Sequence, residues 1–466
     1  MGSIYLNEKI AEGGFGLVFR VDRTERAVCG EMDCRTRDCV AKLMERKDAK
    51  KELDILKDVR EKILDPEIRK SVVIDASMCE IDEVENYYEN SNITRHFDDP
   101  VIMVFENAGI DFFTFITSSH YTIPINSTTL MQMEQFLYFL IILLFKYQMI
   151  HADIKMENIV YSIEKGYQLI DWGLATTLER TNDIMNNRLS SEWIVNYDDL
   201  YYKLPIVHLY HNLSRGPIDR IEDLQKEYFT RFMDNLLYLV NSYTSNFQEH
   251  MEKEIAKANE YFNGQNIEEL QLQIMLKYDV FSMGIILLTQ ISCWYEFCKY
   301  DYTGHFRVTM HQLQLFIDYL LDRCIIGDVR KMNTFPELYL AYTSFMLHPE
   351  VINEIGLTEE DINHLKSRRN EVNYNDPSFN MYLTDFLNDG VSGIKWDIIE
   401  PPLEPDGVST EELKIVDRES HFSTISEHAE TDDISHDGGG TDKSNVHFPN
   451  RSMVKTVTYR FIKNTD

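Results

Sequence analysis

Two short segments in the middle of the chain carry side chains suited to phosphate and metal chemistry. Residues 151–158 read His-Ala-Asp-Ile-Lys-Met-Glu-Asn, and residues 170–173 read Ile-Asp-Trp-Gly. Asn158 lies five residues after Asp153, and Asp171 lies thirteen residues after Asn158. An aspartate can orient a hydroxyl group, whereas an asparagine and a second aspartate offer the oxygen ligands that Mg²⁺ prefers. The pattern therefore predicts a site that could hold Mg²⁺ on phosphate groups.

A glycine cluster near the start of the chain predicts a place for the phosphates. Residues 10–18 read Ile-Ala-Glu-Gly-Gly-Phe-Gly-Leu-Val. Glycine has no Cβ, so backbone amides in such a loop can approach phosphate oxygens. On its own the cluster is also typical of an ordinary hairpin turn. In the same way, Lys42 after a strand and Glu52 in the next helix are, singly, typical of solvated surface charges.

A mixed α+β framework must position these segments. Strand patterns at 4–11, 17–21 and 39–43 precede helical spacing of apolar residues over 47–64, and an apolar run at 101–105 suits a buried strand. The rest is mostly helical, with a long helix expected over 128–149. A small hairpin between residues 159 and 170 would bring the two chemistry-bearing segments together.

Taken in order, these motifs resemble those of the eukaryotic serine/threonine protein kinases, over residues 4–345. The resemblance implies a bilobal fold, with a β-rich N-lobe over about 4–106 and a larger helical C-lobe over about 110–345. It implies an enzyme that transfers the γ-phosphate of ATP to Ser or Thr of protein substrates, with ATP and Mg²⁺ as cofactors. Divergence of this kind also occurs in kinases encoded by large DNA viruses, and the motifs assign no subfamily.

The resemblance also implies a role for each catalytic side chain. Lys42 would bind the α- and β-phosphates and pair with Glu52, for which Glu61 is the alternative. Asp153 would orient the substrate hydroxyl and accept its proton, and Lys155 would neutralise the transferred group and favours Ser/Thr over Tyr specificity. The implied metal ligands are Asn158 and Asp171.

A further set of residues is implied to hold the nucleotide. Residues 101–109 would form the last N-lobe strand and the hinge, with Phe105 as gatekeeper. The backbones of Glu106 and Ala108 would bond the adenine, and Asp111 would meet the ribose. The full implied set is Ala11, Gly13, Gly14, Gly16, Val18, Ala41, Lys42, Phe105, Glu106, Ala108 and Asp111.

Three residues would support the catalytic segment. His151 and Trp172 would pack in the spine between the lobes, and Asp279 would anchor the catalytic segment from below.

The sequence departs from the family's pattern at several positions. Ala11 replaces the first loop glycine, and we expect weaker nucleotide affinity from it. Ala152 replaces an arginine that responds to a phosphorylated activation segment, so we expect an enzyme that needs no such phosphorylation. Ile206 replaces a glutamate, which leaves Arg330 free or differently paired. Residues 206–277 form an insertion, expected to be a helical surface elaboration or, alternatively, a docking site for a partner.

Two other functions remain open at this point. The chain would be a pseudokinase, an ATP-binding scaffold, if Ala11 and the missing glutamate at 206 abolish catalysis. A small-molecule kinase of the aminoglycoside-phosphotransferase type shares the Asp-to-Asn spacing but rarely carries a lysine at position 155.

The composition of the chain indicates which kinds of partner and which cellular compartment to expect. The chain has 466 residues and a net charge of -31. A chain this acidic repels phosphate backbones, so we expect protein substrates as partners and no binding of nucleic acid. The apolar run at 136–145 is too short to span a membrane, and no apolar signal segment begins the sequence. Seven cysteines, an odd number, are expected to be reduced thiols. We therefore expect an intracellular protein, cytoplasmic or nuclear.

The C-terminal part differs in composition from the rest. Residues 346–400 are expected to form a helical extension. Residues 401–466 are acidic and rich in Ser, Thr and Gly, so they predict a mostly disordered tail, with a strand or docking segment at 453–463.

Overall fold

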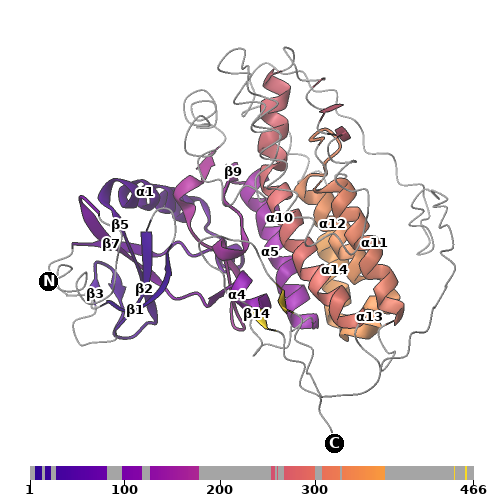
Figure 1. Ribbon diagram of the computed structural model, residues 1–466, viewed down its shortest axis with the longest axis horizontal. Helices are drawn as coiled ribbons and strands as arrows, with labels where there is room; N and C mark the ends of the chain where they lie inside the picture. The colour runs from indigo at the N-terminus through magenta and orange to yellow at the C-terminus, as the bar shows by residue number, and fades with distance from the viewer. Residues whose placement is uncertain are drawn as a thin grey trace, which may run out of the picture. The chain divides into compact units, whose positions relative to one another are not determined.

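The computed structural model describes residues 6–12, 16–22, 28–80, 97–117, 126–177, 267–299, 307–325 and 328–372, with a few more at 253–260, 445–446 and 457–458. It is a mixed α+β structure with an N-terminal sheet followed mainly by helices (Figure 1). The chain divides into two units, residues 1–392 with 448–455 and residues 393–447 with 456–466. In the second unit the described residues are the short antiparallel pair β13 (Asn445–Val446) and β14 (Val457–Thr458).

A five-stranded antiparallel sheet forms the N-terminal region, in the order β1-β2-β5-β7-β6. Its central strand β5 is buried over most of its length, which fits the apolar pattern of the sequence. The strands expected near 4–11, 17–21, 39–43 and 101–105 are all confirmed. The five strands are β1 (Leu6–Glu12), β2 (Gly16–Val21), β5 (Cys39–Glu45), β6 (Ala76–Cys79) and β7 (Pro100–Glu106).

Helix α1 (Arg46–Lys62) follows β5 directly and confirms the helix expected over 47–64. It buries Ala49, Leu56 and Val59, whose spacing places them on one face of the helix. The Glu45 carboxylate accepts hydrogen bonds from the two backbone amides that precede β7, at 2.8 and 3.1 Å. The start of the helix is thereby tied to the sheet.

Shorter elements connect the sheet to the helical region. The predicted hairpin is present as β10 and β11, to which β8 adds a third strand. A second small pair joins β9 to β12. These elements are β8 (Ile110–Asp111), β9 (Met149–Ile150), β10 (Ile159–Ser162), β11 (Gly166–Leu169) and β12 (Thr176–Thr177), with the 3₁₀ turns η1 (Met156–Asn158) and η2 (Trp172–Leu174).

The later part of the chain is helical, as Figure 1 shows. The helix expected over 128–149 is observed as α5, which ends earlier because residues 149–150 form β9. The expected helical extension after 346 is present up to residue 372. The helices are α2 (Pro66–Arg69), α4 (Phe112–Thr117), α5 (Ser127–Phe145), α10 (Ile267–Lys299), α11 (Arg307–Arg323), α12 (Phe335–Met346), α13 (Pro349–Ile355) and α14 (Glu359–Val372).

Helix α5 is long and apolar enough to cross a membrane by length and composition alone. However, 67% of its apolar window is buried inside the protein, as in the core helix of a soluble domain. It also carries the buried Glu134, whose carboxylate accepts a hydrogen bond from the Tyr339 hydroxyl and lies 3.4 Å from Arg368 of α14.

The expected insertion at 206–277 is described only at its end. Residues 206–252 lie outside the described residues, as do residues 178–205. Helix α10 runs continuously from Ile267 through Asp279 to Lys299, so the end of the insertion and the segment around Asp279 form one helix. The predicted disordered tail also lies outside the described residues, apart from β13 and β14.

Four of the cysteines are paired, in place of the reduced thiols expected from the sequence. Cys29 is bonded to Cys79, and Cys34 is bonded to Cys39, with Cα atoms 5.7 and 5.6 Å apart. The first pair joins β3 (Val28–Cys29) to the edge strand β6, and the second closes the turn between β4 (Met32–Asp33) and β5. The expectation was wrong here because it rested on the number of cysteines, whereas pairing depends on the fold: the sheet brings Cys29 to Cys79 across 50 residues, and a local turn brings Cys34 to Cys39.

Gly109 occupies a position that no other residue fits without distortion. Its φ is +120°, and a Cβ there would lie 2.1 Å from the Tyr161 carbonyl oxygen of β10. At Gly356, which ends α13 with φ +69°, a Cβ would meet nothing within 4 Å. The two glycines therefore separate the cost of the backbone conformation from the cost of a steric clash.

We expect Gly109→Ala to lower the free energy of unfolding by about 3 kcal/mol or more, because it adds a clash to backbone strain. Gly356→Ala, the matched control, should cost only about 1 kcal/mol. Urea denaturation of both variants checks this, and equal losses would contradict the close approach between Gly109 and β10.

Candidate functional site

The core of the site is a buried lysine between two carboxylates. Lys42 lies in β5, and its Nζ donates to Glu52 Oε2 of α1 at 2.9 Å and to Asp171 Oδ1 at 2.9 Å. The side chains of Lys42 and Glu52 are 11% and 3% exposed. Glu52 shares the buried face of α1, whereas the alternative, Glu61, is exposed. The structure thus brings Lys42 together with Glu52.

Electrostatics keep this lysine charged in spite of its burial. Burial alone would lower the pKa of Lys42, but the Asp171 and Glu52 carboxylates raise it above its usual value. Burial also opposes ionisation of Asp171, yet Lys42 lowers its pKa overall. Burial raises the pKa of Glu52, against the pull of Lys42. The cluster therefore presents an ionised Asp171, whose side chain is 29% exposed.

The second part of the site is the segment 153–158. Asn158, at the end of η1, donates from Nδ2 to the Asp153 carbonyl at 2.8 Å and to Asp153 Oδ2 at 2.9 Å. Lys155 Nζ lies 3.5 Å from the same carboxylate oxygen. Because its amide nitrogen is engaged by Asp153, the side-chain oxygen of Asn158 is oriented away from that carboxylate and can act as a ligand.

The β10–β11 hairpin joins the two parts. The amide of Ile170 donates to the Asn158 carbonyl at 2.9 Å, which holds together the two ends of the hairpin. The next residue, Asp171, has φ +61° and precedes η2. The twelve residues between Asn158 and Asp171 therefore bring these two candidate oxygen ligands to the same end of the hairpin.

A buried aspartate holds the backbone before Asp153. Asp279 of α10 accepts hydrogen bonds from the amides of His151 at 2.7 Å and Ala152 at 3.0 Å. Ala152 has φ +62°, a strained conformation that these bonds help to retain. The His151 ring meets the Trp172 ring edge-on, with centroids 4.9 Å apart. The structure thus places Asp279 under the segment, as expected, with His151 and Trp172 in contact with each other beside it.

The segment expected to bind the nucleotide base is the end of β7 with residues 107–109. Glu106 pairs with Cys39 of β5, and its carboxylate forms a 2.7 Å ion pair with Lys165 from the β10–β11 turn. Ala108 is buried, and its amide donates to no oxygen among the described residues. Phe105 is partly buried at the end of β7. Asp111 Oδ1 accepts from the Thr114 amide at 2.7 Å, so this carboxylate also caps α4.

The glycine loop is described only in part. Gly13 and Gly14 lie outside the described residues. Ala11 pairs with Val18 across β1 and β2, and Val18 pairs with Lys42, so the loop's flanks adjoin the lysine. Gly16 lies close to β5, since a Cβ there would be 2.6 Å from the Leu43 carbonyl oxygen. Ala41, also expected in the site, is fully buried.

Sequence reasoning missed Lys165 and the partner of Arg330. Nothing in the spacing of Lys165 indicates its bond to Glu106, which depends on the turn geometry. Arg330 forms a two-point ion pair with the fully buried Asp328, at 2.9 and 2.7 Å, so it is differently paired, one of the two alternatives. The one hint of this pairing in the sequence was the carboxylate of Asp328, two positions before Arg330.

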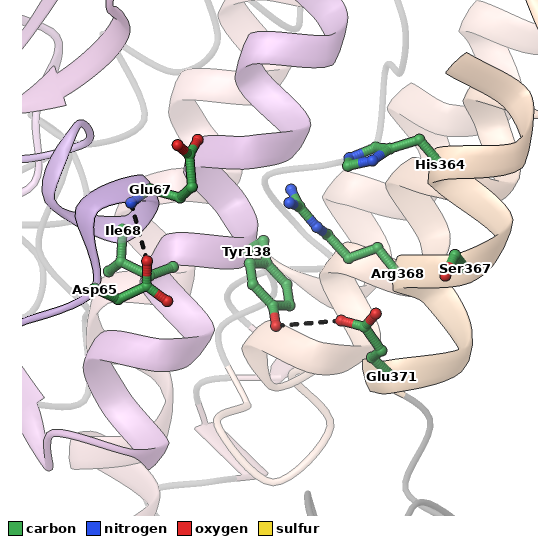
Figure 2. Close-up of a pocket in the computed structure, with 8 residues that line it drawn as sticks. All are labelled: Asp65, Glu67, Ile68, Tyr138, His364, Ser367, Arg368 and Glu371. Carbon is green, nitrogen blue, oxygen red and sulfur yellow. Dashed lines mark hydrogen bonds between the residues drawn. The ribbon is translucent and has the colours of Figure 1, made fainter. Parts of the chain in front are cut away.

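A separate cavity of about 280 Å³ lies among residues of α14, α5 and the start of α2 (Figure 2). Arg368 points over the Tyr138 ring, 4.5 Å from its centroid, and the Tyr138 hydroxyl lies 3.5 Å from Glu371. None of the candidate site residues lines this cavity.

Comparison of the chain with models of known protein families found no match. Comparison with curated proteins likewise found no similar sequence.

His151 makes the stability of the site depend on pH. It is fully buried, and burial lowers its pKa from 6.5 to about 4. Between these values the unfolded chain binds a proton that the folded chain does not, so His151 destabilises the fold as the pH falls below 6.5. This one group should remove about 2 kcal/mol between pH 7 and pH 5.

We expect His151→Gln to reduce the difference in unfolding free energy between pH 7 and pH 5 by about 2 kcal/mol. Urea denaturation at the two pH values measures it. His311→Gln, which alters an exposed histidine of α11, is the control and should leave the difference unchanged. An unchanged difference in the His151 variant would mean that His151 is not buried as a neutral group.

Proposed function

We propose that the chain is a protein kinase that transfers the γ-phosphate of ATP to serine or threonine residues of protein substrates. The observation that carries the proposal is the contact of Lys42 with both Glu52 and Asp171, at 2.9 Å each. A kinase needs such a lysine on the third strand of its N-terminal sheet, which is β5 here, paired with a helix glutamate. It also needs an aspartate to bind the metal. Asp153 and Asn158 meet at the same hairpin.

A bilobal arrangement is part of the proposal. The five-stranded sheet with α1 would be the small lobe, and the region built on α5, α10, α11 and α12 would be the large lobe. Residues 105–109 would form the hinge between them. The buried Ala108, whose amide donates to no oxygen among the described residues, supports a hinge that bonds the adenine.

The residues at the phosphate end fit Mg²⁺ and ATP. Asp171 uses Oδ1 for Lys42, which leaves Oδ2 as a ligand, and Asn158 offers its amide oxygen. When bound, Mg²⁺ would neutralise the charge that develops on the phosphates. Lys42 would hold the α- and β-phosphates by its ammonium group.

Asp153 and Lys155 would act on the groups that react. Asp153 would accept a hydrogen bond from the substrate hydroxyl, orient its oxygen and take its proton. As the new P–O bond forms, the bond from the γ-phosphorus to the β,γ-bridging oxygen would break and ADP would leave. Lys155, 3.5 Å from that carboxylate, would offset the negative charge of the transferred group. Positioning and charge neutralisation account for most of the catalysis in this class of reaction.

The first experiment is a phosphorylation assay of the purified chain with Mg-ATP and a mixture of basic proteins, followed by phosphoamino acid analysis. We expect phosphoserine and phosphothreonine, and a loss of about 10²- to 10⁴-fold in kcat for Asp153→Asn. Asp54→Asn, which removes an exposed carboxylate from α1, is the charge-matched control and should keep full activity.

The outcome separates the proposal from its alternatives. Binding of Mg-ATP without phosphorylation of any protein would favour the pseudokinase scaffold, and phosphorylation of small molecules alone would favour a small-molecule kinase. Equal activity of the Asp153→Asn variant and the native chain would remove Asp153 from the mechanism.

The environment of Ala152 supports activity without prior phosphorylation. Ala152 is fully buried and carries no cation that a phosphorylated activation segment could satisfy. Its amide is already held by Asp279. The catalytic segment therefore has a support that does not depend on a phosphate group.

We expect treatment with a protein phosphatase to leave kcat within about twofold of its initial value, since no step of the proposed mechanism needs a phosphorylated residue. The measurement is the rate of substrate phosphorylation before and after treatment, with mass spectrometry to verify that phosphate has been removed. Loss of activity on treatment would contradict this independence.

A further inference from the structure

A small closed turn precedes the strand that carries Lys42. Residues 34–38 connect β4 to β5, and the disulfide between Cys34 and Cys39 closes this turn. Asp33 holds the turn from within, because its carboxylate accepts from the Arg35 amide at 3.1 Å and from the Arg35 guanidinium at 2.8 Å. The Arg37 amide donates to the Asp33 carbonyl at 3.2 Å. The turn is therefore a compact unit with its own bonds.

The last residue of this turn binds the proposed hinge. The Asp38 carbonyl accepts from the Asn107 amide at 2.8 Å, and Asp38 Oδ2 accepts from Asn107 Nδ2 at 2.9 Å. The Asn107 side-chain oxygen in turn accepts from the Gly109 amide at 3.1 Å. One aspartate thus fixes both the backbone and the side chain of Asn107, and through it the conformation of Gly109.

The proposed hinge has a second contact, with the turn between β10 and β11. Lys165 of the β10–β11 turn bonds the Glu106 carboxylate at 2.7 Å. Glu106 pairs with Cys39, which is the first residue of β5 and one partner in the disulfide. The position of residues 106–109 is therefore set by the disulfide-closed turn on one side and by Lys165 on the other.

We propose that the turn closed by Cys34 and Cys39 positions the hinge, with Asp38 as the positioning residue, so that nucleotide affinity depends on whether this disulfide is intact. The proposal rests on the proposed function, because it takes residues 106–109 as the adenine-binding segment. Opening the turn releases Asp38, and the hinge then samples conformations that do not bind the nucleotide. The apparent affinity falls in proportion to the fraction that remains competent.

The redox step is a thiol–disulfide exchange with a dithiol. One thiolate of the dithiol attacks a sulfur of the Cys34–Cys39 bond and forms a mixed disulfide, which the second thiol resolves. The two cysteine sulfurs gain two electrons and two protons, and the dithiol leaves as its cyclic disulfide. Dithiothreitol supplies this reductant in the experiment.

The test is calorimetric titration of the full chain with a non-hydrolysable Mg-ATP analogue, before and after reduction, with thiol alkylation and mass spectrometry to record the state of each cysteine. We expect reduction to weaken binding by about five- to tenfold, the equivalent of one or two hydrogen bonds. Cys34→Ala with Cys39→Ala should bind like the reduced chain and should not respond to dithiothreitol.

The second disulfide provides a matched control. Cys29→Ala with Cys79→Ala removes a bond that is reduced by the same reagent but does not close the Asp38 turn. This variant should keep both the native affinity and the response to reduction. A response lost in this variant, and retained when Cys34 and Cys39 are replaced, would overturn the proposal.

Asp38 is tested without changing a cysteine. Asp38→Ala in the oxidised chain should weaken binding of the analogue about five- to tenfold. Asp38→Asn keeps a side-chain acceptor for Asn107, so it should lose less affinity. Hydrogen exchange at the Asn107 amide should quicken in Asp38→Ala and in the reduced chain. Hydrogen exchange needs no nucleotide, so it tests the positioning of Asn107 independently of the proposed kinase function.

Failure of the hinge proposal and failure of the kinase proposal would give different results. An oxidised native chain that binds the analogue with an affinity unaffected by reduction or by Asp38→Ala would overturn the hinge proposal and leave the kinase proposal intact. A chain that binds no analogue in either state, while Asn107 exchange still responds to reduction, would overturn the kinase proposal and with it the role of the turn in nucleotide affinity.

Discussion

The burial of one ammonium group between two carboxylates is the constraint on which the rest of the structure depends. An unpaired buried charge is expensive, so Lys42 tolerates its position only while Glu52 and Asp171 stay within hydrogen-bonding distance. The three residues come from β5, from α1 and from the segment between β11 and η2. The sheet, the helix and the hairpin must therefore hold fixed relative positions. Two carboxylates for one lysine also leave negative charge directed at any cation that enters.

The backbone beside this cluster is supported from the helical region. Asp279 binds two successive amides, and one of them belongs to Ala152, whose φ of +62° is unfavourable for a residue with a Cβ. Asp171 shows a second positive φ at the other end of the hairpin. Strain of this kind concentrates at sites where geometry matters more than stability. The two strained residues lie on either side of Asn158, which joins both ends through its own bonds.

The sequence predicted those parts of the fold and site whose signal is local. Periodicity located β5, β7 and α1, and fixed spacing located Asp153, Asn158 and Asp171. The choice of Glu52 over Glu61 was also within reach, since Glu52 falls on the face shared by Ala49, Leu56 and Val59. The Cys29–Cys79 disulfide and the contacts of Lys165 and Asp38 could not be predicted, because each joins segments that are distant in sequence. Cys34 and Cys39 lie only five residues apart, but this spacing alone does not show that the turn between them brings the sulfur atoms together. The reduced-thiol expectation relied on composition alone, which carries no information on distance.

Strand β5 explains how the two ends of the site depend on each other. Its first residue, Cys39, pairs with Glu106 of the proposed hinge, and Lys42, three positions later, pairs with Met103 in the same ladder. Because side chains alternate along a strand, a slip of one residue would turn Lys42 to the opposite face of the sheet, away from Glu52. The contacts that place Cys39 therefore also determine the face on which Lys42 projects. The position of Lys42 thus depends on the turn closed by Cys34 and Cys39, through the register of a single buried strand.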